Sequence, residues 1–152
     1  MKPLQARLVR RKTTVAVAES CTGGLLATVL TAHGGSSAFF RGGAVVYSNE
    51  AKTILADVAP DVIHGHGAVS SVVAGALARG ARERLGAAIG IGITGIAGPG
   101  GATPGKPVGL TYVAIDSDAH SAVKKHEWPF DREGNRLASV GAALDLLEKA
   151  LA

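Results

Sequence analysis

The spacing of apolar residues changes along the chain between strand-like and helix-like patterns. Short apolar or β-branched runs predict strands at residues 14–18, 43–48, 88–94, 108–115 and 121–128. Apolar residues three or four positions apart predict helices at residues 3–11, 25–31, 50–55 and 70–85, and a final helix capped by Asp131. This order favours an α/β fold: a three-layer α/β/α single domain over residues 1–152, with a mixed, mostly parallel sheet of about five strands.

Several local features sharpen this prediction. Pro60 and two glycines indicate a loop over residues 57–67. Asn49 is a suitable cap for the helix at 50–55, and Ser70 or Ser71 for the helix at 70–85. We expect these apolar positions to face the core: Leu4, Ala6 and Leu8 in the first helix, Leu25, Leu26, Val29 and Leu30 in the second, and Leu137, Val140, Leu144 and Leu147 in the last.

The predicted topology brings three polar or glycine-rich segments together. In parallel sheets, ligands bind beyond the carboxyl ends of the strands. Residues 20–24, 47–52 and 94–107 all follow predicted strands, and the last segment contains far more Gly and Pro than a plain connection requires. We therefore expect a functional site at this edge.

Composition narrows the function classes. With 47% hydrophobic and 18% charged residues among 152, the chain can form one sizeable core. No apolar run approaches the ~20 residues that span a bilayer, and the first residues lack the apolar core of a signal peptide, so we expect a cytoplasmic protein without membrane contact. A single cysteine excludes an internal disulfide and a cysteine-rich zinc site. His64 and His66 alone leave a metal-ligand set incomplete, so we expect no metal.

The net charge of +4 suits an anionic metabolite as well as nucleic acid. With one Trp, two Tyr and three Phe, the chain has too few aromatics for an evident base-stacking platform, so we do not expect nucleic acid binding.

The turn that ends the first predicted strand has the elements of an anion or oxyanion site. Ser20 stands at its rim, and Gly23 and Gly24 permit a sharp turn into the next helix. Amide groups at a helix start have no partner within the helix and can bind negative charge. By itself this pattern also fits a serine that merely caps a helix.

Five segments, together and in order, resemble the CinA carboxy-terminal domain family over nearly the whole chain. They are Ala18-Glu19-Ser20-Cys21-Thr22-Gly23-Gly24, Tyr47-Ser48-Asn49-Glu50-Ala51-Lys52, His66-Gly67-Ala68-Val69-Ser70, Gly95-Ile96-Ala97-Gly98-Pro99 and Lys106-Pro107-Val108-Gly109. Asp131-Arg132-Glu133 with Arg136 resembles a late segment of the family, although Phe130 precedes the Asp where many members have Gly.

The resemblance implies a nicotinamide-nucleotide amidohydrolase that needs no cofactor. Such enzymes convert nicotinamide mononucleotide to nicotinic acid mononucleotide and ammonia in pyridine nucleotide recycling. It further implies a homodimer or higher homo-oligomer. The alternative is a catalytically silent nucleotide- or partner-binding module associated with competence or the DNA-damage response.

Carried onto this sequence, the resemblance implies Ser20 as nucleophile, Lys52 as proton acceptor and Tyr47 as a nearby polar aid. A basic lysine must be neutral, and because a helix dipole contributes only ~0.3–1 kcal/mol, we expect burial of Lys52 to cause most of the shift. Cys21 is the rival nucleophile, because helix N-termini lower thiol pKa values. Glu19 needs a partner if it is buried, and Lys52 or Thr22 is the expected one.

The remaining expected site residues bind substrate. Glycine-rich turns offer backbone donors to a phosphate or ribose. Arg132 and Arg136 lie on the same helix face, where either guanidinium could reach a phosphate or a neighbouring subunit. Arg136 is the better family match, and we expect Arg132 to be a solvated surface residue. The expected substrate-binding residues are Cys21, Thr22, Gly23, Gly24, Asn49, Thr94, Gly95, Ala97, Gly98 and Arg136.

Overall fold

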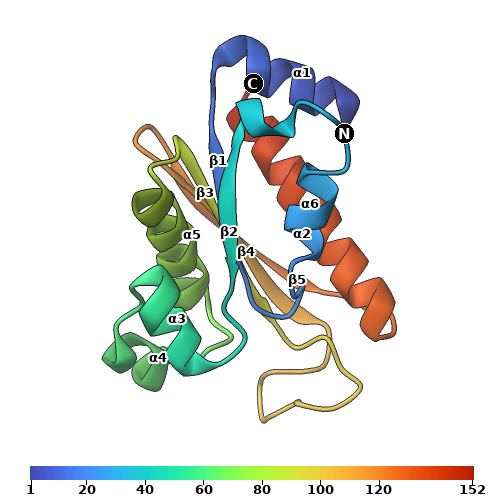
Figure 1. The fold of residues 1–152 in the computed structure, drawn as a ribbon. Helices are drawn as coiled ribbons and strands as arrows, with labels where there is room; N and C mark the ends of the chain where they lie inside the picture. Colours follow the sequence, from blue (N-terminus) through green and yellow to red (C-terminus); the bar gives the residue numbers. More distant parts are fainter.

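A mixed five-stranded sheet forms the centre of the computed structural model, which describes all of residues 1–152 (Figure 1). The strands are β1 (Val15–Glu19), β2 (Phe40–Val45), β3 (Ile89–Gly95), β4 (Leu110–Ser117) and β5 (Ser121–Glu127). Their spatial order is β2-β1-β3-β4-β5. Strand β1 pairs in parallel with β2 and β3, whereas β4 runs antiparallel to β3 and β5.

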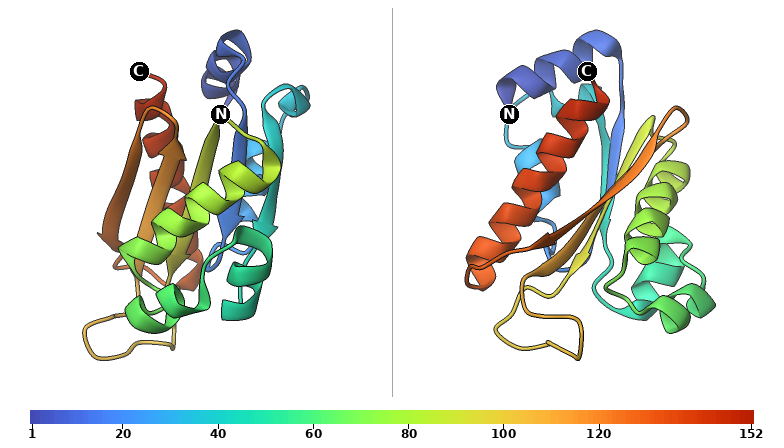
Figure 2. Two further views of the ribbon diagram at one scale, coloured as in Figure 1. Left: turned by 90° about the vertical axis from the view of Figure 1, so that its left-hand side faces the viewer. Right: turned by 180° about the vertical axis from the view of Figure 1, so that it is seen from behind.

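Helices cover both faces of this sheet, as Figures 1 and 2 show. One layer contains α1 (Lys2–Arg11), α2 (Leu25–Leu30) and α6 (Arg132–Ala150). The other contains α3 (Asn49–Ala56), α4 (Pro60–His66) and α5 (Ser71–Leu85). A short 3-10 helix, η1 (Ser36–Ala38), precedes β2. The predicted three-layer α/β/α domain is thus confirmed.

The alternation of side chains along β1 fixes which helices lie on which face. Val15 and Val17 belong to the core beneath α1, α2 and α6, whereas Ala16 and Ala18 belong to the core beneath α3, α4 and α5. Successive side chains of a strand point to opposite faces, so both cores grow from one central strand.

Strand β3 adds a second alternation, in which isoleucines face one layer and glycines face helix α5. A Cβ atom built at Gly90 would lie 1.9 Å from the Ala78 carbonyl oxygen, and one at Gly92 would lie 2.4 Å from the Ala74 carbonyl oxygen. These positions therefore require glycine because the α5 backbone packs directly on the strand.

Three predicted boundaries were wrong. Residues 57–67 contain helix α4, because Pro60 occupies the first helical turn, where a missing N–H costs nothing. Strand β2 covers Phe40–Val45 rather than residues 43–48. Asn49 is the first residue of α3, and Ser48 caps the helix by accepting a hydrogen bond from Ala51 N at 3.0 Å.

The helix caps and core faces were mostly predicted correctly. Ser70 caps α5 and Asp131 caps α6, as expected. Leu137 is 53% exposed and Ala6 is also exposed, contrary to expectation. Val140 and Leu147 of α6 are buried as expected, and Ser139 and Ala143 are buried beside them, because small and polar residues also occupy the inner face of this helix.

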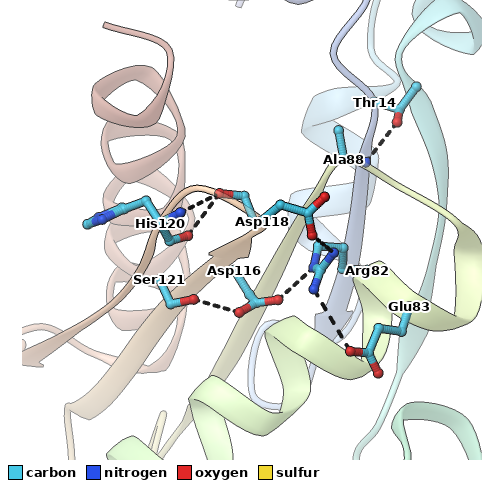
Figure 3. Close-up of polar contacts among 9 residues, drawn as sticks. Thr14, Arg82, Glu83, Ala88, Asp116, Asp118, His120 and Ser121 are labelled. Atoms are coloured by element: carbon cyan, nitrogen blue, oxygen red, sulfur yellow. Dashed lines mark hydrogen bonds and ion pairs between the residues drawn. The ribbon is translucent and has the colours of Figure 1, made fainter.

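An ionic cluster fixes the end of the sheet opposite the carboxyl ends of β1–β3 (Figure 3). Arg82 of α5 pairs with Asp116 at 2.6 Å and with Asp118 at 2.8 Å, and Ser121 Oγ donates a hydrogen bond to Asp116 at 2.7 Å. The cluster ties the β4–β5 hairpin to helix α5.

None of the helices combines the length and apolar character that crossing a bilayer requires.

Candidate active site

Ser20 lies directly beyond the carboxyl end of β1, near the centre of the sheet. Its backbone N–H donates to Ile93 O at 2.9 Å, which continues the β1–β3 pairing by one residue. On the other side of β1, Val46 N donates to Glu19 O at 2.8 Å. The backbone at Glu19 and Ser20 is therefore held from both sides, and Ser20 is 8% exposed.

Lys52 reaches Ser20 from the first turns of α3. The residue is only 2% exposed, so the expected burial is confirmed. Its Nζ lies 3.2 Å from Ser20 Oγ and 2.9 Å from Val46 O, with the carbonyl oxygens of Tyr47 and Ser48 at 3.4 and 3.5 Å.

Lys52 Nζ donates in all four contacts, one to the Ser20 hydroxyl and three to backbone carbonyl oxygens. Loss of one proton from this amine would free a lone pair that can accept the Ser20 hydroxyl proton. Burial lowers the pKa of Lys52 below its ordinary value, against smaller opposing effects of Cys21 and Glu50.

Backbone donors gather in the turn beside Ser20. Gly23 and Gly24 have φ values of 59° and 101°, which glycine adopts without strain. The N–H groups of Cys21, Thr22 and Gly24 have no acceptor within the chain. An oxyanion formed next to Ser20 Oγ therefore has candidate donors in the turn.

Glu19 occupies the first amide groups of helix α2, contrary to expectation. Its carboxylate, 1% exposed, accepts hydrogen bonds from Leu26 N at 3.0 Å and Ala27 N at 2.8 Å. It makes no hydrogen bond to Lys52, and the buried Thr22 hydroxyl has no partner. The carboxylate thus satisfies the helix start, where negative charge is stabilised.

Cys21 is poorly suited to be the nucleophile. It is 7% exposed and packs with the core beneath α1, α2 and α6. Burial raises the pKa of its thiol to about 11, the reverse of the lowered value expected at a helix start. At neutral pH the residue is therefore a thiol.

A cavity of about 270 Å³ opens above Ser20 and Lys52. Most of the expected site residues line it, and Thr22, Gly23, Gly24 and Arg136 do not. Its walls are formed by Ser20, Cys21, Tyr47, Asn49, Lys52, Ala68, Val69, Thr94, Gly95, Ile96, Ala97, Gly98, Gly100, Gly101 and Arg132.

Arg136 donates hydrogen bonds to the backbone of the turn that follows Ser20. Its Nε donates to Cys21 O at 3.2 Å and its Nη2 to Thr22 O at 3.0 Å. It also lines a second, adjoining cavity of about 640 Å³, which shares Ala97 and Arg132 with the first.

Arg132 is the wall residue that sequence reasoning assigned to solvent. Its Nη1 donates to Gly98 O at 2.7 Å and its Nη2 to the Tyr47 hydroxyl at 3.1 Å, which joins three segments around the cavity. The four-residue spacing between Arg132 and Arg136 was the sequence signal that could have placed Arg132 at the site. Neither guanidinium has a carboxylate within ion-pair distance.

Three side-chain hydrogen bonds tie the glycine-rich segment of residues 94–107 to its neighbours. Thr94 Oγ1 donates to Ala68 O at 2.8 Å, Asn135 Nδ2 to Ala97 O at 3.0 Å and Lys106 Nζ to His66 O at 3.2 Å. No group of three or more His, Cys, Asp or Glu side chains is placed to hold a metal ion.

Comparisons with known proteins agree on one family. A family model described as the CinA C-terminal domain matches residues 1–151. A crystal structure of competence/damage inducible protein CihA from Agrobacterium tumefaciens superposes with a TM-score of 0.91 at 38% identity, covering 99% of this chain and 94% of that one. A CinA superfamily protein from Escherichia coli gives a TM-score of 0.93 at 32% identity, covering 97% and 86%.

Relatives with high identity are much longer than this chain. A CinA-like protein from Koribacter versatilis is 54% identical over 144 residues, which are 95% of this chain and 35% of that protein. A putative competence-damage inducible protein from Moorella thermoacetica is 51% identical over 146 residues, 96% of this chain and 35% of that protein. The chain thus spans about a third of these curated relatives.

Proposed function

The chain belongs to the CinA C-terminal domain family, and on this premise we propose that it hydrolyses the carboxamide of nicotinamide mononucleotide to nicotinic acid mononucleotide and ammonia. The observation that carries the proposal is a buried lysine amine 3.2 Å from a serine hydroxyl at the base of a cavity. An amine with a lowered pKa can activate a hydroxyl without histidine.

In the first half of the reaction, Ser20 Oγ attacks the carboxamide carbon while Lys52 Nζ takes the hydroxyl proton. The resulting ammonium then gives that proton to the departing nitrogen, so ammonia leaves and an acyl-serine ester remains. In the second half, Lys52 takes a proton from water, the hydroxide attacks the ester, and the proton returns to Ser20. Water is the only co-reactant, so the balance requires no metal or redox cofactor.

The turn supplies donors for the charge that forms on the amide oxygen. The N–H groups of Cys21 and Thr22 are the nearest donors in sequence to Ser20, and they have no acceptor in the chain. One such donor contributes about 10²–10³ in rate in other acyl-transfer enzymes. Arg136 holds the carbonyl groups of the same two residues, which keeps the turn rigid.

Two guanidinium groups at the larger cavity support a phosphorylated substrate, although Asp131 and Glu133 also line that cavity. The 270 Å³ cavity suits the nicotinamide ring, and the adjoining 640 Å³ cavity leaves room for ribose and phosphate. Arg132 borders both cavities and Arg136 the larger one, and neither charge is neutralised by a carboxylate. We assign the phosphate to these guanidinium groups, with Asn49, Thr94 and the Gly98 loop around the ring and ribose.

The direct test is ammonia release from nicotinamide mononucleotide by the purified protein. Ser20→Ala and Lys52→Met are expected to lower kcat at least about 10³-fold, because the nucleophile and its base act as a unit. Ser36→Ala and Lys2→Met are matched controls on exposed or partly exposed positions away from the cavity, and both should turn over normally. Full activity of Lys52→Met would remove the proposed mechanism.

A catalytically silent nucleotide- or partner-binding module is the second candidate. It is favoured by the names of two of these relatives, which refer to competence and damage rather than to hydrolysis, and by the additional length of the curated relatives. Calorimetry with nicotinamide mononucleotide separates the two functions. Tight binding without ammonia release supports the silent module.

A further inference from the structure

A separate groove lies between the edge strand β5 and helix α6, and it shares no residue with the cavity above Ser20. Its volume is about 330 Å³. Lys124, His126 and Trp128 form its strand side, and Gly141, Asp145 and Lys149 contribute to its helix side. Pockets of this size accommodate small organic molecules.

The strand side of the groove presents two stacked aromatic rings. The ring centroids of His126 and Trp128 lie 4.5 Å apart with an angle of 9° between the planes. Trp128 Nε1 donates to the buried Ser139 Oγ at 3.1 Å, and Trp128 N donates to Gly109 O at 3.0 Å. Both rings are half-buried, so they form a fixed aromatic surface before any ligand arrives.

The surroundings of this pair favour the neutral imidazole. Burial, together with the nearby Lys124 charge, lowers the pKa of His126 below its ordinary value of 6.5. The stacked surface is therefore apolar in character and suits another planar ring.

The opposite end of the groove is cationic. Neither Lys124 nor Lys149 has a carboxylate within ion-pair distance, whereas the neighbouring Lys125 pairs with Glu127 at 3.4 Å. Lys124 lies four residues before Trp128 on an extended segment, so the Cα atoms of these two residues are about 13 Å apart. This is the separation between the cationic end and the aromatic end of the groove. Asp145 on the helix side can accept hydrogen bonds from amino or hydroxyl groups.

The helix side leaves space for a flat molecule. Gly141 is exposed within α6, and a Cβ atom built there would have no atom within 4 Å. Glycine within a helix is less favourable than alanine by about 1 kcal/mol, yet no neighbour in the chain requires its small size.

We propose that this groove is a second ligand site that binds a planar aromatic monophosphate, with the ring on the free face of the His126–Trp128 stack and the phosphate between Lys124 and Lys149. The site is independent of the proposed hydrolase function, because none of its residues touches the Ser20 cavity. A mononucleotide has the required chemistry at both ends, whereas a free base or a sugar phosphate has it at one end only.

Trp128 is the chain's single tryptophan, so its fluorescence reports directly on this groove. The experiment titrates the intact protein with adenosine 5′-monophosphate, excited where tyrosine does not absorb. A saturable change is expected, with adenosine and ribose 5-phosphate each binding about tenfold or more weakly because each lacks one half of the contacts. No saturable change with the monophosphate would overturn the proposal.

Variants test the two ends of the groove. Lys124→Ala and Lys149→Ala are each expected to weaken binding about tenfold, and Lys125→Ala, which lies on the other face of β5, should bind like the parent. Gly141→Leu should block the groove without removing any charge, and its melting midpoint shows whether it folds. If Lys124→Ala and Lys149→Ala bind as tightly as Lys125→Ala, the assignment of the phosphate is wrong and the proposal fails. Ammonia release is measured separately, so its absence leaves this result unaffected.

Discussion

Replacing Glu19 by Gln tests how the catalytic turn is held. The change keeps the shape of the side chain and removes its charge. In the parent, both carboxylate oxygens accept backbone hydrogen bonds, at 3.0 Å from Leu26 N and 2.8 Å from Ala27 N. A glutamine amide has one acceptor oxygen, so its NH₂ group would face the second N–H and leave a buried donor unpaired.

The expected loss follows from these two contacts. A hydrogen bond to a charged group contributes about 1.5–3 kcal/mol and a neutral one about 0.5–1.5 kcal/mol, while an unpaired buried donor costs about 1–3 kcal/mol. We therefore expect Glu19→Gln to lower the free energy of unfolding by about 2–4 kcal/mol. For a chain of this size that corresponds to a melting midpoint lower by about 4–16 °C.

Urea denaturation and thermal melting measure this loss, with Glu148→Gln as the control. Glu148 is exposed on α6, so its replacement should stay within about 0.5 kcal/mol of the parent. The pH profile of ammonia release supplies a second readout, because Glu19 makes no hydrogen bond to Lys52. Unchanged stability together with a displaced acid limb would show that Glu19 serves the lysine and would refute this reasoning.

Three further predictions concern the site and its scaffold. Because Lys52 must be deprotonated to act, kcat/KM should rise with pH towards the lowered pKa of its amine. Glu50→Gln removes a charge that raises this pKa, so the rising part of the pH–rate profile should move to lower pH. Profiles of kcat/KM against pH for the two proteins check both expectations. Cys21→Ala should keep its turnover, and loss of activity in this variant would contradict the assignment of Ser20 as nucleophile. Alkylation of the parent thiol, followed by mass spectrometry, should be slow at neutral pH, because burial raises the pKa of Cys21 to about 11. Arg82→Met should lower the free energy of unfolding by about 1–3 kcal/mol in urea, because it leaves the half-buried Asp116 without a cation and with only the Ser121 hydroxyl as partner. The value of kcat/KM should stay unchanged, because Arg82 does not line the cavity.

The sequence predicted the sheet well because its signals are local. The short apolar run of β1 and that of β3 each indicate a buried strand without reference to any partner. Helix α4 was missed for the same reason. Pro60 and Gly65 resemble loop residues when taken alone, and only the completed helix shows that the proline stands in its first turn.

The site was predicted less completely because its contacts join distant segments. Glu19 and Arg132 were both considered at the sequence level, but their hydrogen-bond partners were not predicted. Glu19 binds the start of α2, and Arg132 binds Gly98 and Tyr47. No spacing rule connects those positions. The burial of Lys52 could be predicted, because a lysine that acts as a base needs a lowered pKa and burial lowers it. The roles of these residues in catalysis remain predictions.

The periodicity of β1 also separates the two candidate nucleophiles. Val17 points to the layer of α1, α2 and α6, and Ala18 points to the layer of α3, α4 and α5. Continuing this alternation, Glu19 binds the start of α2, Ser20 meets Lys52 of α3, and the next residue returns its side chain to the first core. The backbone N–H of Ser20 still pairs with β3, and the chain bends at this residue, directly after β1 ends at Glu19. The choice of serine as the residue beside the lysine therefore follows from the parity of its position in the strand, before any difference between hydroxyl and thiol chemistry is considered.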